Sequence, residues 1–111
     1  MQVCVVSLRY VIQFSIRKGG ETKMIIAITY DLNKSGQDYD NLFKKIQSLG
    51  IAHHAIQNLW FLDTRTSLSD ASSSLLSVMD KNDSLFICEL AKNSYKGWLP
   101  QSSWDWLNSR L

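Results

Sequence analysis

Residues 24–32, MIIAITYDL, form an apolar run of strand length and constrain the fold more than any other segment. The run lacks the alternation of a half-exposed strand, so it predicts a central strand that is buried on both faces. Such a strand needs neighbours in a sheet and a covering layer on each face. The run closes on Tyr30 and Asp31, and a carboxylate at the tip of a buried strand either caps the next turn or binds a metal ion.

Two later segments have the three- and four-residue spacing of amphipathic helices. The first spans residues 39–50 and ends at Gly50, and the second spans residues 66–83 with Ser67 or Ser69 as its N-cap. The expected apolar stripes consist of Leu42, Phe43, Ile46 and Leu49 in the first helix and of Leu68, Ala71, Leu75, Leu76 and Met79 in the second. The serine-rich sequence SDASSSLLS weakens the second helix.

Short apolar segments predict three more strands and a tail helix. Residues 51–57 and 58–65 are rich in apolar and aromatic side chains and are expected to form a hairpin or one bent strand. Residues 84–91, SLFICELA, predict the last strand. Within residues 97–111, Pro100 stands where a first helical turn tolerates proline, so a short C-terminal helix is expected.

From Met24 the order is β-α-β-β-α-β plus a helix, which predicts an α+β fold. The expected architecture of residues 24–111 is one ferredoxin-like βαββαβ sandwich, with both helices on one sheet face and an added C-terminal helix. Both faces of the strands carry apolar residues, so the second face should be buried by another copy or by the tail helix. We expect a homodimer, with the tail tryptophans as packing anchors: Trp98, Trp104 and Trp106.

Residues 1–23 allow two interpretations. Residues 19–24, GGETKM, can be encoded by GGA-GGA-GAA-ACA-AAA-ATG, which contains a sequence like a ribosome-binding site upstream of a start codon. Met24 would then be the native start in a bacterium or phage, and residues 1–23 would be a mis-annotated leader. Alternatively, the β-branched sequence QVCVVSLRYVIQFSI forms an extra N-terminal strand.

Charge and cysteine content narrow the function classes. Residues 1–23 carry four basic side chains and one acidic one, whereas residues 24–111 carry eight basic and nine acidic ones, so the body is not a strongly basic nucleic-acid binder. Cys4 and Cys88 are the two cysteines, and this low number favours a reducing, cytoplasmic location. The N-terminal apolar stretch is interrupted by Arg9 and Gln13, so no membrane role is expected.

The strand ending in AITYDLN, followed by helix, aromatic hairpin, helix and strand, resembles the small CRISPR-associated subunit of spacer acquisition and its relative, virulence-associated protein D. The sequences YDLNKSGQDYDNLFKKIQSLG, NLWFLDT and GWLPQSSWDWLN are similar to short bacterial and phage-borne proteins labelled SinR-like. The resemblance covers residues 24–111 and implies a ferredoxin-like dimer. It also implies that the aspartate closing the first strand, here Asp31, faces its symmetry mate and binds a divalent metal for phosphodiester hydrolysis.

Two aspartates are therefore candidate metal ligands. Asp31 would bind Mg²⁺ or Mn²⁺ together with its copy across a two-fold axis and would be the catalytic residue. The antiparallel topology places Asp83 near the same end of the sheet, as a second candidate ligand. The alternatives are an Asx turn at Asp31 and a helix-to-strand turn at Asp83.

Other polar residues give weaker signals. His53 and His54 are strand neighbours that point to opposite faces, so they cannot serve one catalytic site, and each alone is more often structural. A small basic and aromatic surface for single-stranded RNA or DNA could be formed by Lys34, Lys44, Lys45 and Arg65 with Tyr39 and Trp60. The alternative is a solvated helix face beside core aromatic residues.

Two functions follow from these patterns. One is a metal-dependent endonuclease, or a nucleic-acid-binding dimer, that acts through Asp31. The other is a non-catalytic dimeric interaction module of a bacterial or phage mobile element, which the near-neutral body favours. The sequence alone does not decide whether the chain is an enzyme.

Overall fold

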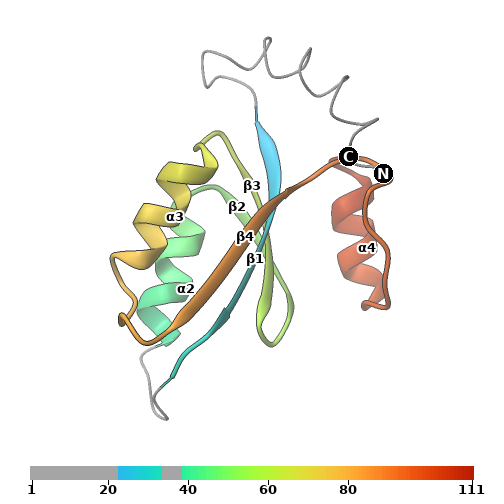
Figure 1. The fold of residues 1–111 in the computed structure, drawn as a ribbon. Helices are drawn as coiled ribbons and strands as arrows, with labels where there is room; N and C mark the ends of the chain where they lie inside the picture. Colours follow the sequence, from blue (N-terminus) through green and yellow to red (C-terminus); the bar gives the residue numbers. More distant parts are fainter. Residues whose placement is uncertain (1–22, 34–38) are drawn as a thin grey trace.

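The apolar run forms one of the two inner strands of a four-stranded sheet in the computed structural model, which describes residues 23–33 and 39–111 (Figure 1). Residues 1–22, for which a leader or an extra strand is predicted, lie outside these ranges. The elements are β1 (Met24–Asp31), α2 (Tyr39–Ser48), β2 (Ile51–Ile56), β3 (Leu59–Thr64), α3 (Leu68–Leu76), β4 (Ser84–Leu90) and α4 (Gln101–Asn108).

The strands lie in the order β2-β3-β1-β4, and every neighbouring pair is antiparallel. This order and the β-α-β-β-α-β sequence of elements are those of a ferredoxin-like fold, so the predicted α+β class is confirmed. The register aligns side chains in rows across three strands. Leu59, Thr29 and Phe86 form one such row, and Phe61, Ala27 and Cys88 form the next.

The first face of the sheet is covered by α2 and α3, which lie on the same side in Figure 1. Ile26 and Ile28 of β1 are fully buried there because the helices present their apolar stripes to the same face. The buried residues of this core are Ile26, Ile28, Tyr30, Leu32, Leu42, Ile46, Trp60, Leu62, Ala71 and Leu75.

Tyr30 is a polar residue that this core accommodates through hydrogen bonds. Its hydroxyl accepts a hydrogen bond from Trp60 Nε1 (3.1 Å) and donates one to the carbonyl of Gln57 (3.1 Å). Burial raises the pKa of Tyr30, and the nearby Tyr39 adds to this, so the phenol stays neutral. The tyrosine at the end of the apolar run is therefore a core residue that ties β1 to the β2–β3 hairpin.

The opposite side of the sheet, which we call the second face, is covered by α4 (Figure 1). Its core combines Ile25 of β1, Ala55 of β2, Phe61 of β3 and Leu107 of α4. Trp104 and Trp106 pack against this core, as predicted for tail anchors. The same prediction is wrong for Trp98, which is 98% exposed.

Helix α3 is shorter than the predicted range 66–83. Ser67 caps its start, since Ser67 Oγ accepts a hydrogen bond from the backbone N–H of Asp70 (3.1 Å). The helix stops at Leu76, where Ser77 Oγ donates to the carbonyl of Ser74 (2.6 Å), a local bond that competes with continued helix. Leu76 is 52% exposed, so the prediction that it belongs to the apolar stripe is wrong.

The segments that join these elements are tight. A Cβ on Gly50, between α2 and β2, would collide with the backbone carbonyl of Asp63, so only glycine fits this close approach.

The described helices contain ten, nine and eight residues, and none of them has the length and apolar character needed to cross a membrane.

We predict that Leu107→Ala destabilises the domain by about 2–5 kcal/mol, because it removes a buried side chain that joins α4 to the second face. Urea denaturation followed by circular dichroism measures this change. The neighbouring Asn108→Ala, at an exposed position of the same helix, is the control and should change stability little. Equal unfolding midpoints for the two variants would contradict a structural role for α4.

Candidate functional site

Asp31 is the last residue of β1 and is exposed. Strand alternation places it on the second face together with Ile25, Ala27 and Thr29. Its backbone is in register with Ser84, the first residue of β4. The core under α4 includes Ile25 and Ala27 but not this end of the strand, so Asp31 lies at an end of the second face that α4 leaves uncovered.

Phe86 lies at the same end. It is 64% exposed, although it is part of a strand, and it is in register with Thr29, two residues before Asp31. We call the surface formed by Thr29, Asp31, Ser84 and Phe86 the uncovered end of the second face. It combines one carboxylate, two hydroxyl groups and one aromatic ring.

Asp83 lies close to Asp31 along the sheet edge but has a different role. Its two carboxylate oxygens accept hydrogen bonds from the backbone N–H groups of Asn33 and Asp80, each at 2.8 Å. These bonds hold the turn before β4 against the end of β1. Asp83 therefore has the role of the alternative interpretation, a residue of the helix-to-strand turn. Asp83 also has the strand parity of Leu85, which packs in the first-face core, whereas Asp31 is on the second face.

The described part of one chain does not bring enough donor side chains together for a metal centre. In residues 23–33 and 39–111, no three His, Cys, Asp or Glu side chains come together as ligands. A single carboxylate is a poor site for Mg²⁺ or Mn²⁺, which take several oxygen ligands. Asp31 would therefore need ligands from a second molecule, and the predicted metal site stays a prediction.

The predicted nucleic-acid residues lie on different elements. Lys44 and Lys45 are on α2, and Arg65 follows β3 directly, while Lys34 is outside the described residues. Trp60 is a core aromatic residue, as in the alternative interpretation of this surface, and it is buried and stacks on His54 with ring centroids 4.3 Å apart. A buried indole cannot stack on a base, so the predicted aromatic part of this surface is reduced to Tyr39.

The two histidines point to opposite faces, as predicted. His54 lies on the first face, where it contacts Phe43 of α2 and donates through Nε2 to the carbonyl of Gln57 (3.0 Å). His53 lies on the second face, with Nε2 2.9 Å from the hydroxyl of Ser103, a buried residue of α4. Neither histidine is near Asp31, which lies at the end of a different strand.

His53 is part of a cluster that holds α4 on the sheet. Its ring stacks on Trp106, at 5.7 Å between centroids and 25° between planes. The Arg110 guanidinium lies 4.1 Å from the centroid of the Trp106 ring and donates through Nε to Asp63 of β3 (3.2 Å). We call this set the α4 clasp: His53, Asp63, Ser103, Trp106 and Arg110.

Sequence reasoning did not find the α4 clasp. Ser103, Trp106 and Arg110 recur at three- and four-residue spacing, so their shared helix face was readable from the sequence. Their partners were not readable, because His53 and Asp63 come from two strands that precede the helix by about forty to fifty residues.

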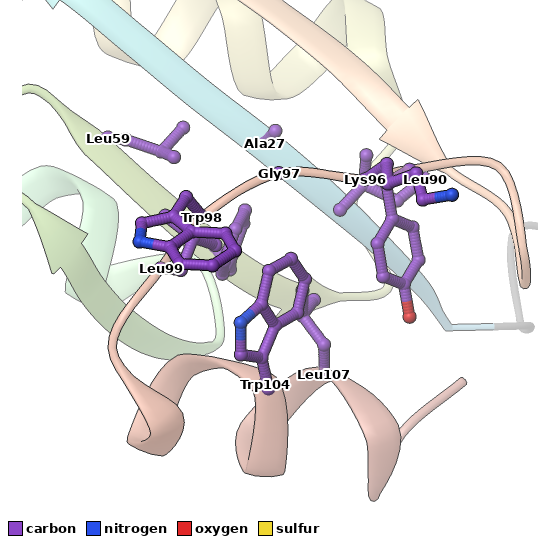
Figure 2. A pocket seen from close by; sticks show the side chains of 11 residues that line it. Ala27, Leu59, Leu90, Lys96, Gly97, Trp98, Leu99, Trp104 and Leu107 are labelled. Carbon is purple, nitrogen blue, oxygen red and sulfur yellow. The ribbon is translucent and has the colours of Figure 1, made fainter.

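An apolar cavity of about 200 Å³ lies between the second face and the tail (Figure 2). Ala27, Leu59 and Phe61 of the sheet form one side, and Trp104 and Leu107 of α4 form another. The rest of the lining consists of Leu90 and the tail residues Tyr95, Lys96, Gly97, Trp98 and Leu99. Figure 2 shows Trp98 beside Leu59, which is in the same cross-strand row as Phe86.

Cys88 also lies on the second face and is half-buried with a free thiol. Burial raises the pKa of Cys88, although a hydrogen bond with the backbone of Ala27 acts in the opposite direction. A thiol with a raised pKa is mostly protonated at neutral pH and is a weak nucleophile.

Comparisons with known proteins support the fold and leave the function open. No model of a known protein family matches the chain, and no curated protein matches it. The crystal structure of a hypothetical protein, TT1823 from Thermus thermophilus, superposes with a TM-score of 0.53 at 19% sequence identity, over 71% of this chain and 96% of that one. At this identity the likeness shows the fold alone.

We predict that the free energy of unfolding decreases as the pH falls below about 6.5, the ordinary pKa of histidine. Burial lowers the pKa of His53 in the folded state, and the charges of Arg110 and His54 add to this effect. As the pH falls, the unfolded chain therefore binds this proton before the folded protein does. The contribution of His53 to stability is complete above the ordinary pKa of histidine, and it decreases until the pH is below the pKa of His53 in the folded state.

Urea denaturation of His53→Gln and the parent protein between about pH 5 and 8 measures this dependence. The variant should have a flatter stability profile. His54→Gln, at the neighbouring position on the first face, should keep most of the slope of the parent, because burial is the largest cause of the lowered pKa of His53 and the charge of His54 is the smallest. Parallel profiles for the parent and His53→Gln would show that His53 is not the group responsible.

Proposed function

We propose that this protein is a homodimeric, non-catalytic interaction module that uses the uncovered end of the second face as its contact surface. The observation that carries the proposal is the exposure of Phe86 on a sheet face whose core is buried under α4. An aromatic ring on a strand is usually covered, and a contiguous exposed apolar patch on a small domain is typical of an interaction site. The two cysteines suit the cytoplasm as the place of action.

Charge supports a second copy as the partner. Residues 24–111 carry eight basic and nine acidic side chains, so two copies do not repel each other strongly. The same balance gives little attraction for a phosphate backbone, which favours a protein partner over general binding of RNA or DNA. A two-fold contact would also use one surface twice, as closed homodimers do.

We predict that the full-length protein is a dimer at micromolar concentration in light scattering coupled to size exclusion. Phe86→Ser should weaken the dimer, because it removes the exposed ring at the proposed contact. Leu76→Ser is the matched control, since Leu76 is similarly exposed but belongs to α3 in the layer on the other side of the sheet. A monomeric parent protein would refute the proposal.

A second candidate function is metal-dependent hydrolysis of RNA or DNA, which the resemblance to the CRISPR-associated subunit implies. It is favoured by the position of Asp31, exposed at the same uncovered end as Phe86. A two-fold contact at this end would bring the two copies of Asp31 into one interface, where Mg²⁺ or Mn²⁺ could bind between them. This candidate therefore requires the dimer and adds a property to it.

Asp31→Asn separates the two functions. If the carboxylates bind metal, the variant should lose all cleavage of labelled RNA and DNA in Mg²⁺ or Mn²⁺, while the dimer stays at least as stable because two like charges no longer face each other. In a non-catalytic module, the parent protein cleaves neither substrate with either metal or with chelator. Equal cleavage by the parent and Asp31→Asn would also exclude Asp31 as the catalytic residue.

A further inference from the structure

Trp98 is the most exposed large apolar residue among those that the structure describes. Its side chain is 98% accessible, although tryptophan is among the side chains that gain most from burial. It lies in the tail segment between β4 and α4, next to Gly97 and Leu99. The indole is therefore almost fully exposed to solvent, at the rim of the apolar cavity that it helps to line.

The local backbone keeps Trp98 outside. Leu99 packs against the core of the second face, and Pro100 restricts the preceding residue to an extended conformation. Neighbouring side chains of an extended segment point in opposite directions, so an inward Leu99 directs Trp98 outward. The exposed indole is thus a consequence of how the tail is attached to α4.

The apolar cavity opens beside this indole (Figure 2). Its volume of about 200 Å³ is below the roughly 300–1,000 Å³ of common small-molecule pockets and suits a single large side chain. Two of its lining rings, Tyr95 and Trp104, are nearly parallel, at 6.3 Å and 12°. Such rings offer faces and edges on which another indole can stack in an offset arrangement.

Trp98 projects from the surface next to the apolar cavity. A surface with both features can fit the same surface of a second copy. A two-fold axis between them brings each projection to the cavity of the other copy, and the contact closes without growing into a fibre. Trp98 lies beside Leu59 in Figure 2, and Leu59 shares a cross-strand row with Phe86. The contact would thus adjoin the uncovered end of the second face.

We propose that Trp98 of each copy inserts into the apolar cavity of the other and is the anchor residue of the homodimer. The inference rests on the proposed function, because it specifies how the dimeric contact is made. Its occupant is the indole of a second copy of this chain. An indole that is exposed in the monomer and buried in the dimer contributes mainly to the rate of dissociation.

The experiment compares full-length parent, Trp98→Ala, Trp98→Phe and Leu76→Ala by sedimentation over a dilution series. Trp98→Ala should weaken dimerisation by roughly tenfold or more, as for truncation of an interface anchor. Trp98→Phe should retain part of the affinity, because a smaller ring still enters the cavity. Leu76→Ala removes an exposed side chain from the opposite layer and should dimerise like the parent.

Tryptophan fluorescence gives an independent reading of the same contact. The difference between the emission of the parent and of Trp98→Phe isolates Trp98 from the other three tryptophans. This signal should be red-shifted and readily quenched by acrylamide in dilute protein, and blue-shifted and protected when the dimer forms.

The outcomes separate this inference from the proposed function. If the parent dimerises and Trp98→Ala dimerises equally well, the insertion is refuted while the dimeric module stands. If Trp98 is protected from acrylamide even in the monomer, the indole occupies the cavity of its own chain, and the insertion is again refuted. A monomeric parent protein refutes both.

Discussion

The burial of β1 on both faces is the constraint on which the rest of the structure depends. As an inner strand it pairs with β3 and β4, so its backbone is satisfied, but its side chains need a cover on each side. The alternating residues Ile26 and Ile28 obtain that cover from α2 and α3. Ile25 obtains it from the tail, mainly from α4, a helix of eight residues near the far end of the chain.

A helix of that length is not stable by itself, so its position depends on tertiary contacts. Leu107 supplies the apolar contact, and the α4 clasp adds the hydrogen bond between His53 and Ser103 and the contacts of Arg110 with Asp63 and Trp106. Because these contacts hold the helix over one part of the second face, the other end of that face stays open. The exposure of Asp31 and Phe86 is a direct result of how far α4 reaches.

This small, nearly neutral domain carries exposed aromatic rings at the uncovered end of the second face and in the tail. Phe86 lies on β4 and Trp98 lies in the tail that covers the same face. Leu59 connects the two positions, because it shares a cross-strand row with Phe86 and lines the same cavity as Trp98. Within the described residues no set of metal-binding side chains accompanies Asp31, so chemistry at this end depends on what a partner contributes. The proposed metal site at Asp31 would therefore require the proposed dimer.

The sequence by itself determined the order of the elements, the α+β class and the opposite orientations of His53 and His54, because strand and helix periodicities act over neighbouring residues. It did not determine that α3 stops at Leu76, that Asp83 binds two backbone N–H groups, or that Trp60 is buried while Trp98 is exposed. Those features depend on side chains and turns that meet only after the strands pair and α4 docks. Periodicity shows which residues share a face, whereas only the tertiary structure decides how much of that face is covered.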